Sequence, residues 1–253
     1  LLMLAAMAVL PGIDVIAKVL GQQGMPILQV VWARLAIGAA LSLPFALRIG
    51  GRAALWPDRP VYHLVRAGFL VLATFCFFLS LTFLPIADAL AIFFVQPLIV
   101  TILSALILRE QVGPRRCAAV AVGFIGTLII IRPGFAEVNP GSLLALAAGA
   151  SLACYFVMTR RIAGRTDAMI TTFHTSLLGG LLLSLVIWSV WQWPTPAQWA
   201  MFVALALIAT FGHLMIVRAY DHAEASLLAP LAYTEMIMAT ILGWLFFQDF
   251  PDG

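Results

Sequence analysis

The sequence predicts an all-α integral membrane protein built as an inverted repeat of two five-helix bundles, and three observations lead to this fold class. Of its 253 residues, 63% are hydrophobic and only 10% are charged, whereas soluble domains carry roughly 25% charged residues. The apolar residues form continuous blocks of about 20, the length of helix that crosses ~30 Å of hydrocarbon. The two halves of the chain also resemble each other in sequence.

Prolines, glycines and charged residues separate the apolar blocks, as helix-breaking turns would. Runs such as LLALAAGASLACYFVM are apolar throughout, which favours helices over membrane strands, because such strands alternate with a period of two. The pattern therefore predicts nine helices, near residues 1–20, 26–47, 62–84, 86–108, 115–132, 139–160, 168–192, 197–220 and 223–248.

The basic residues are distributed unevenly between the two sides of the expected helices. If the first helix starts in the cytoplasm, only Lys18 and Arg132 fall outside. By the positive-inside rule the amino terminus is then cytoplasmic, and the expected location is a bacterial inner membrane. This topology accounts for the net charge of +3 without a nucleic-acid partner. The cations on the inner side are Arg48, Arg52, Arg59, Arg66, Arg109, Arg115, Arg116, Arg160, Arg161, Arg165 and Arg218.

The internal repeat sets the domain organisation. At an offset of 142 residues, LLMLAAMAVL matches LLALAAGASL, and the same offset aligns Gly38 with Gly180 and Ser42 with Ser184. Further along, FVQPLIVTILSALILRE resembles YTEMIMATILGWLFFQD. We expect one repeat over 1–135, with five helices, and a second over 136–253, with four. The tenth helix is expected beyond Gly253, and the true start of the first helix before Leu1.

A five-helix unit has an odd number of crossings, so its second copy enters the membrane from the opposite side. Inverted repeats of this kind are common in secondary transporters, whose substrate site lies near the bilayer midplane between the repeats. The repeat therefore predicts a site between the two halves.

Several segments carry a family resemblance: Lys18, RLAIGAALSLP, LPIADALAIFFVQPLIVTILSALILRE followed by VGFIGTLIIIRPG, and AEASLLAPLAYTEMIMATILGWLFFQD. By these segments the sequence resembles the EamA-like permeases of the drug/metabolite transporter superfamily. The resemblance implies ten helices around a central cavity, and transport of amino acids, nucleotide-like metabolites, vitamins, sugars or drugs. Some related alphaproteobacterial proteins are labelled as S-adenosylmethionine or riboflavin carriers.

Two charged residues are expected at mid-depth in opposite halves: Arg34 in the second helix and Glu235 in the ninth. A charge at the bilayer centre costs about 2.5–3.5 kcal/mol on insertion scales, so each needs a partner or a function. We expect Arg34 to bind an anionic group of the substrate, and Glu235 to bind a cationic group or carry a coupling proton. The alternative is a buried Arg34–Glu235 ion pair that only fixes the packing.

Asp14 is a second candidate for proton coupling, although its spacing from Lys18 also suits an intrahelical ion pair. Gln96 precedes a proline in the fourth helix and aligns with Glu235 in the repeat. Because a proline frees a backbone carbonyl, irregular helices of this kind often line cavities. Gln96 is therefore expected to contact substrate.

Four further side chains are candidates for substrate binding: Trp32, Tyr155 and Tyr233 by stacking on a planar group, and His174 by hydrogen bonding. A packing role is the alternative for each of them, and for His213. The acidic residues in predicted loops are expected to be solvated; they are Asp58, Glu110, Glu137, Asp167, Asp249 and Asp252.

These observations favour a secondary carrier that works by alternating access. An intramembrane enzyme would show clustered acid–base residues, and a receptor-like protein would need no inverted repeat. The sequence lacks GxxxxGK[ST], HExxH and GxSxG segments, so no catalytic residues, metal or cofactor are expected. The expected partners are the lipid bilayer and a small-molecule substrate, with a homodimer as a further option.

Overall fold

The computed structural model describes residues 1–131 and 139–248. Its helices are α1 (Leu2–Val9), α2 (Pro11–Gln22), α3 (Ile27–Gly50), α4 (Pro60–Ser80), α5 (Ile86–Phe93), α6 (Gln96–Leu103), α7 (Pro114–Ile131), α8 (Pro140–Ile162), α9 (Ala168–Ser184), α10 (Pro196–His222), α11 (Ala225–Leu228) and α12 (Glu235–Phe247). Short 3₁₀ turns occupy η1 (Gly51–Leu55), η3 (Ile187–Ser189) and η4 (Ala229–Thr234), and a π-helical turn occupies η2 (Ser104–Leu108). Arg132 and the predicted repeat boundary between residues 135 and 136 lie outside the described residues, as do Glu137, Asp249 and Asp252.

The predicted membrane-spanning segments appear as helices. Seven of them, among the described residues, are long and apolar enough to cross a membrane. The helix predicted over 168–192 is shorter in the structure: α9 ends at Ser184, and a 3₁₀ turn follows it. Beyond it, Trp188 and Trp193 are exposed and Trp191 packs against both rings.

Three of the spans are interrupted near their middles. The first breaks between α1 and α2, where Pro11 is the first residue of α2. The fourth breaks between α5 and α6, and Pro97 lies in the first turn of α6. The ninth passes from α11 through the 3₁₀ turn η4, which contains Pro230, into α12. Proline removes a backbone donor and clashes with the preceding turn, which accounts for each interruption.

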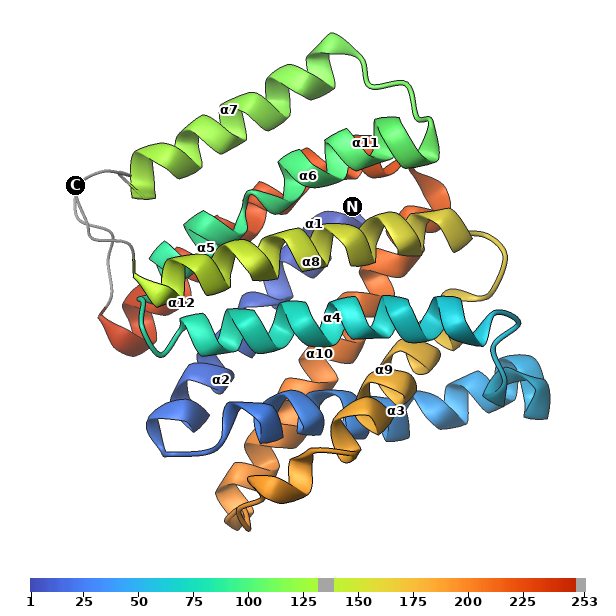
Figure 1. The fold of residues 1–253 in the computed structure, drawn as a ribbon, viewed down its shortest axis with the longest axis vertical. Coiled ribbons are helices and arrows are strands. Elements are labelled where there is room, and N and C mark those ends of the chain that lie inside the picture. The colour runs from blue at the N-terminus through green and yellow to red at the C-terminus, as the bar shows by residue number, and fades with distance from the viewer. Residues whose placement is uncertain (132–138, 249–253) are drawn as a thin grey trace.

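The packing has the symmetry expected of an inverted repeat (Figure 1). In the first half, α4 packs on α8 and α9 of the second half; reciprocally, α10 of the second half packs on α1 and α3 of the first. The equivalent helices α3 and α9 pack on each other, and the broken spans α5–α6 and α11–α12 do the same. Most of the main contacts therefore join opposite halves.

Local geometry repeats as well. Ser42 donates a hydrogen bond to the Gly38 carbonyl at 2.7 Å, and the aligned Ser184 donates to the Gly180 carbonyl at 2.8 Å. A β-carbon on Gly180 would lie 3.3 Å from the backbone of α3, so the glycine allows the close crossing of α3 and α9. Small residues serve this purpose in membrane helices.

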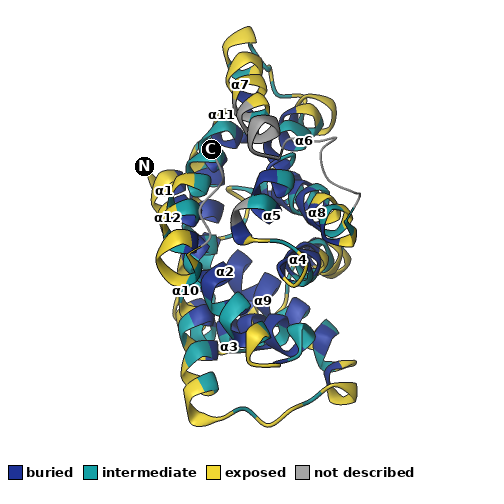
Figure 2. Ribbon diagram, turned by 90° about the vertical axis from the view of Figure 1, so that its left-hand side faces the viewer, coloured by how far each residue is buried: buried dark blue, intermediate teal, exposed yellow. Residues whose placement is uncertain are grey.

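The buried residues gather between the helices and the exposed apolar residues face outward (Figure 2). Outward-facing side chains such as Leu106, Leu185 and Ile237 are more than half exposed, as expected where lipid is the surrounding solvent. In Figure 1, α7 lies at one edge of the molecule, where it contacts α5, α6 and η4. The interior therefore lies between the two halves, where the polar residues collect.

Candidate functional site

A cavity lies between the two halves, at the level of the three interrupted spans. Its volume of about 70 Å³ is enough for several water molecules. Both halves contribute to its walls. Its polar lining consists of Asp14, Arg34, Thr74, Gln96, His213 and Glu235, and apolar side chains such as Phe77, Phe93 and Phe156 complete it.

Arg34 is held by two hydrogen-bonding neighbours. α3 carries it into the interior, where it is 7% exposed, and its Nη1 donates to Thr74 Oγ1 at 2.6 Å. Its Nη2 lies 3.2 Å from Nε2 of His213, whose Nδ1 lies 3.2 Å from the Ala209 carbonyl. If Nδ1 donates its proton to Ala209, the unprotonated Nε2 can accept from the guanidinium. The guanidinium thus hydrogen bonds with Thr74 and His213 rather than with Glu235.

The acidic and amide residues of the cavity stand at the starts of half-helices. Asp14 lies in the first turn of α2, Gln96 is the first residue of α6, and Glu235 is the first residue of α12. The proline breaks therefore bring three half-helix starts, together with Arg34, to the cavity that holds the two carboxylates.

The remaining candidates from the sequence lie outside this cavity. Tyr155 lines a smaller neighbouring void together with Arg34. Trp32 donates to Ser184 Oγ at 2.9 Å and packs edge-on against Trp191. His174 bonds the Ala54 carbonyl at 2.8 Å, and Tyr233 packs against Phe94.

Lys18, the expected ion-pair partner of Asp14, has its Nζ 4.5 Å from the ring centroid of Phe247. The structure therefore brings together Arg34, Glu235, Gln96 and Asp14, while Trp32, His174 and Tyr233 sit in packing positions. A role in substrate binding stays a prediction for all of them.

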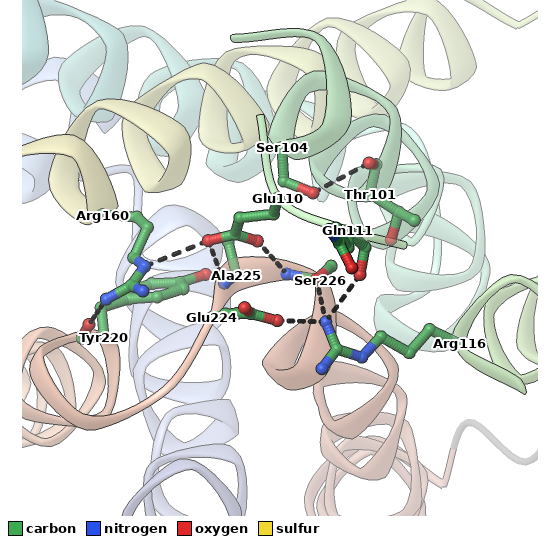
Figure 3. A network of polar contacts seen from close by, with 10 residues as sticks. All are labelled: Thr101, Ser104, Glu110, Gln111, Arg116, Arg160, Tyr220, Glu224, Ala225 and Ser226. Atoms are coloured by element: carbon green, nitrogen blue, oxygen red, sulfur yellow. Dashed lines mark hydrogen bonds and ion pairs between the residues drawn. The ribbon is translucent and has the colours of Figure 1, made fainter. Parts of the chain in front are cut away.

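A second polar cluster, the Glu110 network, joins the two halves at one face of the molecule (Figure 3). Glu110, in the connection between the fourth span and α7, accepts from Arg160 Nε at 3.1 Å and from the backbone N–H groups of Ala225 and Ser226, each at 3.1 Å. Arg160 also donates to the Tyr220 carbonyl at 2.6 Å. We define the network as Glu110, Arg116, Arg160, Glu224, Ala225 and Ser226.

Arg116 makes the second link of this network. It pairs with Glu224 and donates to Ser226 Oγ at 2.7 Å. Glu110 and Arg116 belong to the first half, whereas Arg160, Glu224 and Ser226 belong to the second, so each link crosses between halves. The network therefore links the two halves of the molecule at the face that carries the 109–113 connection.

The expectation that Glu110 is solvated is wrong: its side chain is only 8% exposed. Burial by itself would raise the pKa of this carboxyl. Hydrogen bonds from the Ser226 and Ala225 backbone and from the Arg160 side chain outweigh that effect and lower the pKa below its ordinary 4.5. Glu110 is therefore an ionised cap on the start of α11.

Two residues, Thr74 and Glu110, are not among the site residues predicted from the sequence. For His213 both substrate contact and packing are predicted, and a lone histidine in an apolar helix gives no sign that it faces an arginine. Thr74 carries no signal among the other small residues of α4. Glu110 could have been suspected, because it aligns in the repeat with the end of the ninth span and precedes a basic segment.

The EamA-like transporter family matches residues 1–132 and 139–252. An S-adenosylmethionine uptake transporter of Rickettsia prowazekii is 26% identical over 239 residues, covering 94% of this chain and 81% of the relative. A riboflavin transporter of Vibrio cholerae is 29% identical over 234 residues, with 92% and 78% covered. A pseudopaline exporter, CntI, of Pseudomonas aeruginosa is 26% identical over 231 residues, with 90% and 81% covered.

A solved crystal structure has the same fold, with a TM-score of 0.74 and 22% identity over 98% of this chain and 90% of that one. The names of the relatives indicate a transporter rather than an enzyme. The family match and these relatives confirm the prediction of a multi-pass membrane protein with a small-molecule substrate.

Proposed function

Because the chain belongs to the EamA-like transporter family, we propose that it is a secondary carrier that moves a small polar metabolite across a bacterial inner membrane by alternating access. The observation that carries this proposal is the cavity between the halves, which combines Arg34 with Asp14 and Glu235. Charges so placed in a membrane interior mark substrate and ion pathways.

The charges of the cavity suit a substrate with both an anionic and a cationic group. Arg34 supplies a guanidinium for a carboxylate or a phosphate. Two carboxylates face this one guanidinium, so one of them lacks a buried counter-charge unless it holds a proton or a substrate cation. We propose that Glu235, or Asp14, holds the coupling proton when no substrate cation is bound. An amino acid or an amino-acid-containing metabolite has the matching pair of groups.

Alternating access requires a closure that opens and closes at each face. The Glu110 network supports such a closure, because all its cross-half contacts would break if the halves separated there. By the distribution of Lys and Arg, this face is cytoplasmic and so is the amino terminus. The cavity of about 70 Å³ then represents a state closed toward the cytoplasm, which must widen to admit a metabolite.

Uptake into proteoliposomes tests the proposal. The purified chain would be offered labelled S-adenosylmethionine, riboflavin and a panel of amino acids, with and without an imposed pH gradient, beside empty liposomes. Selective uptake of one compound supports a carrier, and stimulation by the gradient supports proton coupling. Folded protein that takes up nothing in either orientation would contradict it. Association of two copies is a separate expectation, tested by the mass of the protein in detergent.

A further inference from the structure

A second arginine is fully buried in a membrane span, away from the central cavity. Arg66 lies two turns into α4 and is 0% exposed, making it the largest fully buried side chain among the described residues. A charged group inside a membrane is costly, and it is expected to have a partner or a function. Arg66 therefore needs an explanation that the central cavity does not give.

The groups around Arg66 are polar but uncharged. Its Nη1 donates to Thr159 Oγ1 at 3.1 Å, and its Nη2 donates to the Thr171 carbonyl at 2.9 Å and to Thr175 Oγ1 at 2.5 Å. Nη2 also lies 3.4 Å from His63 Nδ1. None of these partners, within residues 1–131 and 139–248, is a carboxylate. The positive charge is hydrogen-bonded but not neutralised.

Two buried side-chain atoms in this cluster have no hydrogen-bond partner among the described residues: Arg66 Nε and His174 Nδ1. His174 Nε2 donates to the Ala54 carbonyl, so Nδ1 of the neutral ring is an acceptor, and the N–H at Arg66 Nε is the unpaired donor. The rings of His63 and His174 lie 5.2 Å apart beside the guanidinium, and the Tyr155 ring lies 5.5 Å from its Cζ. Buried polar groups are almost always hydrogen-bonded, so the unpaired N–H at Nε makes Arg66 a donor that an anion between the two halves can satisfy.

A small void lies between the central cavity and the neighbours of Arg66. It has about 10 Å³, and its lining includes Arg34 and His213 of the cavity together with Thr175 and Tyr155, which contact Arg66. Arg34 donates a hydrogen bond to Thr74 of α4. Arg66 lies eight residues before Thr74 on the same helix, so about 12 Å along the helix axis separates Arg66 from Thr74. Thr175, a hydrogen-bond partner of Arg66, thus faces the space next to Arg34.

The Arg66 cluster and the Glu110 network are linked through consecutive residues of α8. Thr159, which accepts from Arg66, is followed in α8 by Arg160, which pairs with Glu110. The other two partners of Arg66, Thr171 and Thr175, lie on α9. Arg66 therefore contacts the second half through both α8 and α9. Separation of the halves at this face would open the Glu110 network and expose Arg66 together.

We propose that Arg66 forms a second binding site for the anionic group of the substrate, a carboxylate or a phosphate, between the central cavity and the face that carries the Glu110 network. This inference rests on the proposed carrier function and names the chemistry of one substrate group. The anion leaves Arg34, passes Tyr155 and Thr175, and is held by Arg66 as the cytoplasmic side opens. The alternative is that Arg66 only ties α4 to α8 and α9.

Labelling with phenylglyoxal, a reagent for arginine, tests this site in the full-length chain without changing Arg66. Mass spectrometry would follow labelling of Arg66 in detergent, with the exposed Arg48 as internal reference. Because Arg66 is fully buried in the closed state, Glu110→Gln should speed its labelling severalfold. Sodium acetate or sodium phosphate, compared with sodium chloride at equal ionic strength, should then slow labelling of Arg66 severalfold and leave Arg48 unchanged. The more protective salt tells carboxylate from phosphate.

Two results would overturn the proposal: Arg66 that stays unlabelled in the Glu110→Gln protein, or labelling that neither acetate nor phosphate slows relative to Arg48. The assay measures anion binding without transport. If the chain transports nothing but the salts protect Arg66 from labelling, the carrier function is contradicted and the anion site is supported. If the chain transports substrate but neither salt protects Arg66, the carrier function is supported and the anion site is contradicted.

Discussion

The Glu110 carboxylate and Arg160 Nε lie 3.1 Å apart, although the two residues belong to opposite halves of the chain. Glu110 follows the fourth span, and Arg160 closes α8, the sixth span. The same carboxylate caps the start of the ninth span through the backbone of Ala225 and Ser226. Three spans therefore converge on one side chain, and a separation of the halves at this face would break these bonds.

Replacing Glu110 with Gln should open the cytoplasmic side. Hydrogen bonds to charged groups contribute about 1.5–3 kcal/mol, and 1.4 kcal/mol is a factor of ten in a population ratio. A cysteine introduced by Ala73→Cys, in the cavity wall, would report the change in a background without the native cysteines. Its labelling from the cytoplasmic side by an impermeant maleimide should rise about tenfold.

The matched control is Asp167→Asn. Asp167 also caps a helix, through Met169 N at 2.7 Å, but both residues lie in the same half. Its replacement should leave the labelling rate unchanged. Equal rates for Glu110→Gln and the unaltered protein would show that the Glu110 network does not control access.

The Glu110 network should be insensitive to pH near neutrality. The pKa of Glu110 is lowered in the closed structure, so its stabilising contribution is fully present above its ordinary value of 4.5 and is lost as the pH falls through the lower, folded value. The difference in Tm between the unaltered protein and Glu110→Gln should be constant from pH 5.5 to 8 and shrink below about pH 4.5. A difference that changes between pH 6 and 8 would contradict this assignment.

Replacing Arg34 should abolish substrate binding while leaving the fold largely intact. Arg34→Lys keeps the charge but loses the planar pair of donors, so it should raise KM by tenfold or more, and Arg34→Gln should remove measurable uptake. Gln29→Ala is the matched control on the same helix: Gln29 is fully buried and bonds the backbone of Gln192 in both directions. It should lower Tm without changing KM. If Arg34→Gln transports normally, the cavity is not the substrate site.

Replacing Glu235 with Gln should uncouple transport from the proton gradient. The amide keeps the shape of the side chain but cannot release a proton at physiological pH. Net uptake driven by a pH gradient should therefore fall to the level seen without a gradient, while exchange of internal for external substrate persists. Asp14→Asn serves as the comparison, because it is the other carboxylate of the cavity. If only the Asp14 variant loses stimulation by the gradient, the coupling proton belongs to Asp14.

Much of the fold is encoded in local pattern. Runs of apolar residues, and the prolines that interrupt them, locate the spans, and the proline after Gln96 predicts the break between α5 and α6. The repeat predicts that Gln96 and Glu235 occupy equivalent positions, and in the structure each is at the start of a half-helix. Arg34 and Glu235 each lie near the middle of a predicted helix, and this position alone predicts that both side chains lie at the same depth in the membrane.

What the sequence does not reveal depends on packing between the halves. Glu110 stands in a polar connecting segment and resembles a solvated loop residue, yet residues more than 100 positions away bury it. Trp32 is an aromatic residue of the kind that stacks on a planar substrate, but its indole N–H donates to Ser184 of the other half and it is not among the residues that line the cavity. Arg66 counts as an interfacial cation by charge pattern, and only the approach of α8 and α9 encloses it.

Counterflow in proteoliposomes tests alternating access most directly. Vesicles preloaded with unlabelled substrate, once the uptake panel has identified it, would be diluted into a trace of labelled substrate without any ion gradient. A carrier whose one site faces the two sides in turn should show transient accumulation of label above equilibrium, absent with Arg34→Gln. Label that enters at the same rate into preloaded and empty vesicles, without an overshoot, would contradict the account.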